Sequence, residues 1–406
     1  MEKTIVVRKV IKKINQEKIL ILLVPIALIF IPIIVFLRPF FVFRFGLIHS
    51  DRIGHFASNT ALYLKEEQKL KKKNKIDFLY LAPTISNKQL EKMWKRKIRI
   101  YPKNLVRPFW LIFSFFKMRN HLAGVSRYKN RDINNLLYTT KNILDFTKEE
   151  TAYCEKILKK IGINRDKIVL VICRDDNYLK KTFGEGFQYH NYRNVDIETY
   201  AQAVKFLLKK KYSVIRMGKH IKKKLKIKNN NYFELFNSKF HSDLLEIYLA
   251  SICKFCITSS TGYDEVVKIF QRPILYTNVC PISDIQANSK SFIIIFQKYY
   301  CKIEKKFLTF SEIASKNLHE IYSNNDFKKK NIILRKNSSI EILKATEETI
   351  KYVEKKKEEK KYINMQVNFW RNFEKIIIRK SKICHHNLLN ATISNYFLKK
   401  VKNLII

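Results

Sequence analysis

The sequence predicts an α/β protein with two doubly wound lobes and an N-terminal membrane-associated helix. The length of 406 residues suggests about two domains, each large enough to bury its own core. Strand and helix patterns alternate through residues 40–81 and again through 167–277, which is typical of parallel sheets covered by helices. A long uncharged apolar run precedes both lobes.

That apolar run spans residues 19–37 and reads ILILLVPIALIFIPIIVFL. As a helix it would measure roughly 28 Å, close to the ~30 Å hydrocarbon core of a bilayer. Its basic flank predicts a cytoplasmic N-terminus, so a simple span would export the rest of the chain. Pro25 and Pro32 also allow a re-entrant or interfacial segment. We expect residues 1–38 to anchor the chain at the cytoplasmic face of the inner membrane; a buried core helix is the alternative.

The chain is strongly basic, with 80 lysines and arginines against 35 acidic residues and a net charge of +45. Such a charge ordinarily suggests nucleic acid as a partner. Here lysine is spread along the whole chain together with abundant asparagine and isoleucine, as a biased genome composition would also produce. We therefore expect no nucleic acid and assign the basic surface to an anionic membrane. A non-catalytic binding protein for anionic lipid or nucleic acid stays open as an alternative.

The seven cysteines are odd in number and lack the paired spacing of a zinc ribbon or a disulfide framework. Cys253 and Cys256 form one C-x-x-C within an apolar stretch. This pattern predicts a reducing compartment and buried thiols rather than a metal or redox site.

The first lobe, residues 39–150, begins with a strand, loop and helix. Residues 40–48 form a β-rich string, 49–55 a polar loop and 56–70 a helical pattern, and 76–81 supply a second strand. Ligands bind at the carboxyl ends of such parallel strands. We therefore expect three residues of the loop to face a ligand: Arg52, Gly54 and His55. The alternative is a structural turn with an exposed histidine.

The second lobe, residues 151–330, is introduced by a helical pattern that opens at Thr147 with a capping box. Residues 167–173 form a buried strand that delivers Arg174 and Asp175 at its carboxyl end. A guanidinium there could grip a phosphate with two hydrogen bonds. A surface pair between Arg174 and Asp175 is the alternative. The next strand, 212–217, ends at Gly218.

A second candidate site follows the apolar residues 249–257, where we expect a strand to end and a helix to follow at 265–270. The connecting residues are Ser259, Ser260, Thr261, Gly262, Tyr263 and Asp264. Free backbone N–H groups and the positive end of the helix dipole would make this an anion site. A hydroxyl that merely caps its own helix is the alternative. Residues 331–406 read as a helical segment that could pack back on the first lobe.

Taken together and in order, several stretches resemble a bacterial glycosyltransferase family of surface-polysaccharide loci. The resemblance runs from about Pro39 to the C-terminus. The matching stretches are residues 50–57 (SDRIGHFA), 92–94 (KMW), 174–175 (RD), 192–200 (YRNVDIETY), 214–218 (VIRMG), 242–249 (SDLLEIYL), 259–262 (SSTG), 272–276 (RPILY) and 307–310 (FLTF). The family has a histidine two residues before the first arginine, where this chain has Ile172, so that histidine's role does not carry over.

The resemblance implies a GT-B-like fold of two Rossmann-like lobes, with a nucleotide-sugar held mainly by the second and a saccharide or lipid-linked acceptor by the first. It makes Arg174, Arg193 and Arg216 candidates for the donor diphosphate and the stretch 259–262 a candidate for phosphate or ribose. We also expect Asp175, Gly218 and Asp264 in this donor site. The implied activity is sugar transfer in cell-surface polysaccharide or lipopolysaccharide biosynthesis, with no cofactor other than the nucleotide-sugar co-substrate. A nucleotide-sugar epimerase on the same fold is a further alternative.

For the chemistry, a GT-B enzyme needs cationic or dipolar groups on the leaving diphosphate and, for inversion, a base near the acceptor hydroxyl. We expect His55 or Asp51 as that base. No metal is expected, and the chain has no Asp-x-Asp triplet.

Overall fold

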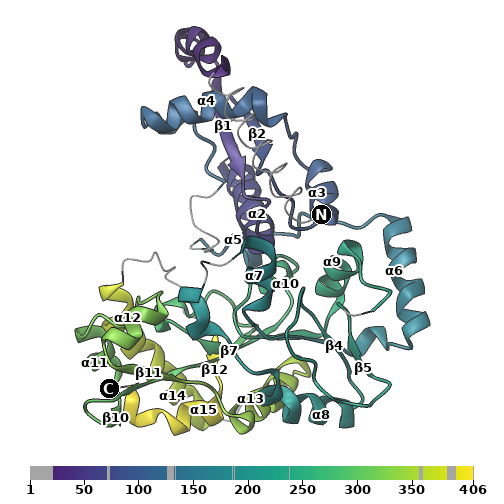
Figure 1. The fold of residues 1–406 in the computed structure, drawn as a ribbon, viewed down its shortest axis with the longest axis vertical. Helices are drawn as coiled ribbons and strands as arrows, with labels where there is room; N and C mark the ends of the chain where they lie inside the picture. The colour runs from purple at the N-terminus through teal and green to yellow at the C-terminus, as the bar shows by residue number, and fades with distance from the viewer. Residues whose placement is uncertain are drawn as a thin grey trace. The chain divides into compact units, whose positions relative to one another are not determined.

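The computed structural model describes residues 22–70, 74–125, 132, 134–184, 186, 188–236, 238–355, 360–381 and 390–405. The chain divides into two compact units, unit 1 (Met1–Asn130) and unit 2 (Arg131–Ile406) (Figure 1). The expected boundary at 150/151 therefore falls inside unit 2. The reason is visible in the contacts of residues 136–146: the Gln271 amide donates to the carbonyl oxygen of Thr140 at 2.7 Å, and the Phe146 ring packs edge-on against Tyr248.

Unit 1 contains the predicted strand–helix–strand arrangement. Strands β1 (Val42–Ile48) and β2 (Lys75–Leu81) pair in parallel and are joined by α2 (Ile53–Leu70). The helix begins earlier than the expected residue 56, so Gly54 and His55 lie in its first turn instead of a loop. Two more helices follow, α3 (Lys88–Lys95) and α4 (Lys103–Phe115). The sequence pattern did not define these two helices.

The core of unit 1 is built from β1, β2 and α4. Phe45, Tyr80, Val106 and Phe113 form a buried cluster there. Residues 22–36, the described part of the expected membrane segment, are helical and pack against this cluster. Within the described residues, no helix is both long and apolar enough to cross a membrane.

Unit 2 is organised around a seven-stranded sheet in the order β12-β8-β7-β6-β3-β4-β5, with every neighbouring pair parallel. Its strands are β3 (Ile168–Ile172), β4 (Ser213–Arg216), β5 (Tyr232–Glu234), β6 (Phe255–Thr258), β7 (Ile274–Val279), β8 (Phe292–Phe296) and β12 (Thr392–Ile393). All five residues of β3 are buried, as expected for a strand covered on both faces. The α/β class and the strands expected at 167–173, 212–217 and 273–277 are confirmed.

Helices flank this sheet (Figure 1). They include α6 (Lys148–Ile161), α7 (Asn177–Phe183), α8 (Ala201–Lys209), α9 (Asp243–Ile252), α10 (Asp264–Ile269) and α13 (Ser339–Val353). The first of them, α6, begins with the expected capping box between Thr147 and Glu150. The six described cysteines are all buried; Cys384 lies outside the described residues. Burial raises the pKa of Cys253 to about 12, which agrees with a core thiol.

The C-terminal part of the chain belongs to unit 2. A small antiparallel sheet is formed by β9 (Lys298–Cys301), β10 (Lys306–Phe307) and β11 (Ile332–Arg335). Around it lie α11 (Phe310–Ser315), α12 (Asn324–Lys329), α14 (Lys360–Asn372) and α15 (Asn395–Lys400). Phe369 is stacked on Phe296 and packs edge-on against Phe310 inside unit 2. Apolar residues in 331–406 thus complete the second core. The expected packing of residues 331–406 on the first lobe stays a prediction.

Candidate anion-binding site

The sheet order of unit 2 has a topological switch point between β3 and β6. The chain proceeds from β3 through β4 to β5 on one side, and from β6 through β7 to β8 on the other, so the order reverses between β3 and β6. In open parallel sheets, ligands bind outside the carboxyl ends of the strands at such a switch point. Arg174 and Ser259 follow directly after these two strands. The backbone N–H of Arg174 donates to the Ser259 hydroxyl at 2.8 Å, so the two predicted stretches do meet.

Arg193 joins them from a different segment. It ends the 3-10 helix η3 (Gln188–Arg193), and its guanidinium donates to the backbone carbonyl of Ser260. The chain around it is tied to the same strand end, because the Val195 N–H donates to the Arg174 carbonyl oxygen at 3.1 Å. The two arginines predicted for a diphosphate therefore share one edge of the sheet.

A third cation completes this group and was not predicted. Lys336 lies in the connection between β11 and α13, and its ammonium group donates to the carbonyl oxygen of Tyr192, the neighbour of Arg193. We call Arg174, Arg193 and Lys336 the cation cluster. The sequence offered only a weak signal for Lys336, namely its position between a strand and a Ser-x-x-Glu capping box at Ser338.

The cation cluster is electrostatically unbalanced. Burial, and next the charge of Arg193, lower the pKa of Arg174 to about 10. Burial is also the main reason that the pKa of Lys336 falls to about 8; the thiols of Cys280 and Cys173 oppose the fall, and both arginines add to it. Among the described residues no carboxylate forms an ion pair with any of the three.

A hydrogen-bonding group of the cluster is also unused. Nε of Arg174 is buried and has no hydrogen-bond partner among the described residues. Like charges that are desolvated together cost free energy unless an opposite charge joins them. A bound anion would supply both that charge and an acceptor for Nε. The cluster is therefore the candidate anion-binding site of unit 2.

Arg216 does not belong to the cation cluster. Its side chain is buried, pairs with Glu234 at 3.2 Å and donates to the Lys223 carbonyl oxygen at 2.5 Å. The charge of Arg216 is thus already balanced within the fold. Gly218, with a φ of 132°, begins the loop that follows. A donor contact by Arg216 or Gly218 stays a prediction.

Asp175 has backbone partners rather than the Arg174 side chain, so the alternative of an Arg174–Asp175 surface pair does not apply. Its carboxylate accepts hydrogen bonds from the N–H groups of Asn177 at 3.0 Å and Lys222 at 2.9 Å. It therefore ties the turn after β3 to the loop after β4. This contact fixes the loop beside the cation cluster.

The stretch from Ser259 to Asp264 forms a turn that is closed by one of its own side chains. The Asp264 carboxylate is buried and accepts from the Thr261 N–H at 2.9 Å and the Thr258 hydroxyl at 3.2 Å. The following helix, α10, has only six residues. Burial, followed by the charge of Glu265, raises the pKa of Asp264. The hydroxyl cap that was the alternative is not formed, because Tyr263 stands at the N-cap position of α10 and makes no side-chain cap hydrogen bond. Asp264 instead closes the turn that precedes the helix. A donor contact by Thr261, Gly262 or Asp264 stays a prediction.

The candidate acceptor-side residues lie in unit 1. Asp51 and Arg52 follow β1, and Gly54 and His55 begin α2. Nδ1 of His55 lies 3.4 Å from the Asn59 side-chain nitrogen, and its ring centre is 6.1 Å from that of His49. These residues stand at the carboxyl end of β1, as expected. Their catalytic role stays a prediction.

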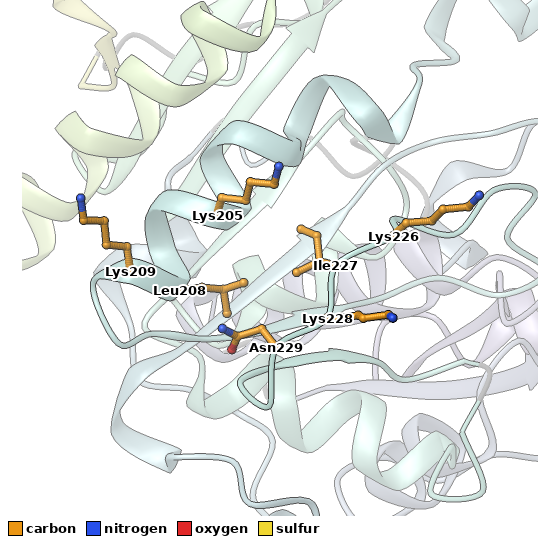
Figure 2. Close-up of a pocket in the computed structure, with 7 residues that line it drawn as sticks. All are labelled: Lys205, Leu208, Lys209, Lys226, Ile227, Lys228 and Asn229. Atoms are coloured by element: carbon orange, nitrogen blue, oxygen red, sulfur yellow. The ribbon is translucent and has the colours of Figure 1, made fainter.

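A pocket of about 400 Å³ lies elsewhere in unit 2, between α8 and residues 226–229 (Figure 2). Its lining contains four lysines, Lys205, Lys209, Lys226 and Lys228, and none of the predicted site residues. Figure 2 shows that the four ammonium groups do not converge on one point. This pocket is therefore a weaker candidate for an anion than the cation cluster.

Comparisons with known proteins add a structural likeness. No protein-family model matches the chain, and no curated protein sequence matches it. A solved structure of the E. coli ADP-heptose LPS heptosyltransferase II is similar at 13% identity with a TM-score of 0.40, covering 77% of this chain and 100% of that one. At this level of similarity, the residues of the cation cluster are a firmer guide to function than the likeness.

Proposed function

We propose that this protein is a glycosyltransferase that moves a sugar from a nucleotide-sugar donor to an acceptor in cell-surface polysaccharide or lipopolysaccharide biosynthesis. The observation that carries the proposal is the cation cluster at the switch point of the unit 2 sheet. The ordered set of motifs that resembles a glycosyltransferase family supports it independently.

The chemistry of sugar transfer matches what the cluster offers. When the bond between the sugar and the diphosphate breaks, negative charge grows on the leaving diphosphate, and fixed cations nearby lower the energy of that transition state. Arg174 and Arg193 can each give two parallel hydrogen bonds to phosphate oxygens, and Lys336 adds a third charge. Burial makes each of these contacts stronger than it would be in water.

The remaining roles in the proposal concern unit 1 and the environment. His55 or Asp51 would accept the proton of the attacking acceptor hydroxyl. The acceptor would be a saccharide or a lipid-linked saccharide, and catalysis would need no metal. The enzyme would act at the cytoplasmic face of the inner membrane, with residues 19–37 as its anchor.

A ligand screen followed by a transfer assay tests this function. We expect one of UDP, ADP, GDP or CMP to raise the melting temperature of the purified chain, and the matching nucleotide-sugar to be consumed when an acceptor extract is added. Release of nucleotide without a new glycoside would point to hydrolysis, and conversion of the donor without any acceptor would point to an epimerase. A chain that responds to none of these nucleotides would contradict the proposal.

A further inference from the structure

Unit 1 exposes an unusual amount of apolar surface on two helices that are far apart in the sequence. The exposed side chains on or next to helix 22–36 are Leu22, Ile26, Leu28, Ile29, Phe30, Ile33, Phe36, Phe40 and Phe41, and those on or next to α4 are Leu105, Phe115 and Phe116. Phe36 is 78% exposed and Phe115 is 81% exposed. Patches of this kind mark interaction surfaces on soluble domains.

The two helices are parts of one surface. Ile31 and Ile34 of helix 22–36 pack against the same buried cluster to which α4 contributes Val106 and Phe113. Figure 1 shows both helices at the same end of unit 1, the first in dark purple. Because this packing uses one side of helix 22–36, lipid cannot surround it on all sides. That arrangement favours a helix that lies along a membrane over one that crosses it.

The charges around the surface fit one kind of partner. Residues 22–50 and 97–125 contain no aspartate or glutamate. Arg38, Lys117 and Arg119 are exposed beside the apolar side chains. An apolar face with a purely basic rim matches an anionic lipid surface, in which the rings enter the acyl boundary and the cations meet the headgroups.

We infer that the Phe115–Phe116 end of α4 is a second membrane contact, which docks unit 1 on an anionic lipid surface together with helix 22–36. The two phenylalanine rings insert at the interface, and Lys117 and Arg119 hold the phosphate groups of the lipids. This inference deepens the membrane part of the proposed function and is independent of the cation cluster in unit 2.

Tryptophan fluorescence offers a local readout of this docking. The chain has three tryptophans: Trp110 is partly exposed on α4, whereas Trp94 and Trp370 are 0% and 8% exposed. Brominated lipid quenches only fluorophores close to it. We expect vesicles that contain brominated phosphatidylglycerol to quench the full chain, and Trp110→Phe to remove most of that quenching.

The decisive variant is Phe115→Ser/Phe116→Ser, which changes two exposed side chains and leaves the core intact. We expect it to bind phosphatidylglycerol vesicles at least tenfold more weakly than the wild type in co-sedimentation and to lose the Trp110 quenching. The matched control is Ile303→Ser, a 73% exposed apolar residue of unit 2, which should bind like the wild type. Lys117→Glu/Arg119→Glu should weaken binding to phosphatidylglycerol vesicles in the same way.

Three outcomes would overturn the inference: unchanged vesicle binding by Phe115→Ser/Phe116→Ser, equal quenching in Trp110→Phe, or loss of a stable dimer of the chain without any change in lipid binding. The last would assign the surface to a second copy of the protein. Nucleotide-induced thermal shifts of the same variants report on unit 2 alone, so a failure of docking and a failure of the donor site are distinguishable.

Discussion

Lys336 has a protonation equilibrium governed by its neighbours, since burial and two arginines lower its pKa to about 8 from an ordinary 10.5. Arg174 and Arg193 could be predicted because each stands at a recognisable strand end or motif. Lys336 could not, because one lysine among many acquires a role only when the fold brings the β11–α13 connection beside Arg193. The same limit applies to Asp264, whose role in closing the turn before α10 depends on its hydrogen bonds from Thr258 and Thr261.

The pH dependence of donor binding should report on Lys336. A nucleotide-sugar diphosphate keeps a constant charge near neutrality, so its affinity should fall by up to about tenfold per pH unit once the pH exceeds about 8 and the free site loses its proton. Lys336→Ala should bind more weakly at pH 7 and lose this dependence, whereas Lys302→Ala, which changes an exposed lysine, should keep it. Isothermal titration between pH 6.5 and 9.5 provides the measurement, and a flat wild-type profile would contradict the assignment.

Without ligand, the same group should affect stability in the opposite direction. Between about pH 8 and its ordinary pKa of 10.5, Lys336 is protonated in the unfolded chain but neutral in the folded one. The unfolded state then binds more protons, so the contribution of Lys336 to the free energy of unfolding rises with pH in that window. The difference in the free energy of unfolding between the wild type and Lys336→Ala, measured across this pH window, gives the contribution of Lys336.

Asp264 should be a structural residue. Asp264→Ala removes the acceptor of two buried donors and should lower the free energy of unfolding by about 1–3 kcal/mol. Asp264→Asn keeps an acceptor and removes a buried carboxylate whose pKa is raised, so it should cost less and bind nucleotide like the wild type. Urea unfolding measures the stability of both variants, and nucleotide titration measures their affinity. Weak nucleotide binding by a correctly folded Asp264→Asn would contradict the structural role and indicate that Asp264 contacts the donor.

At the scale of elements, the β1–α2–β2 arrangement was predictable because its apolar runs have clear periods. The network that locks it was not. Arg44 on β1 pairs with Asp77 on β2 at 2.6 Å and with Glu67 on α2 at 2.8 Å, and it also contacts Tyr63. Arg44 and Asp77 form this pair because the parallel register of β1 and β2 sets them opposite each other, and that register is not evident from the sequence.

Breaking that network should destabilise unit 1. Asp77→Ala removes the two-pronged partner of the mostly buried Arg44, leaves Glu67 as its carboxylate partner, and should cost about 1–3 kcal/mol. Replacing both partners in Arg44→Met/Asp77→Leu should cost less, because no charge stays buried. Urea unfolding followed by circular dichroism compares the two variants. A double variant less stable than Asp77→Ala would contradict this prediction, because it would show that the attraction within the pair exceeds the free-energy cost of burying its charges.

Residues 84–125 show why some elements could not be predicted. In α4 the apolar side chains serve two purposes at once: Val106 and Phe113 fill the core, whereas Leu105 and Phe115 are exposed. These exposed apolar side chains, together with Pro108 inside the helix, weaken the helical signal in the sequence. The exposed apolar side chains that make this helix hard to predict are the same ones that make its outer face a candidate docking surface.

At the scale of the whole molecule, alternating strands and helices indicated an α/β chain, but strand order depends on pairings between distant segments. The order β5-β4-β3-β6-β7-β8 and the addition of β12 from the C-terminus are therefore findings of the structure. The order also explains why the stretches around Arg174 and Ser259 lie next to each other: they follow β3 and β6, the neighbouring strands between which the strand order reverses. The domain boundary and the packing of residues 331–406 depended on such long-range contacts too.

The central claim is that the cation cluster binds the diphosphate of the donor. Isothermal titration of the responsive nucleoside diphosphate into Arg193→Ala should show a loss of roughly ten- to hundredfold in affinity, as expected for one charged hydrogen-bonding group. Arg165→Ala, which changes a half-exposed arginine of the same unit, should bind like the wild type. The corresponding nucleoside without phosphates should bind both variants and the wild type equally. If Arg193→Ala, correctly folded, binds the diphosphate as tightly as the wild type, the cluster is not the donor site.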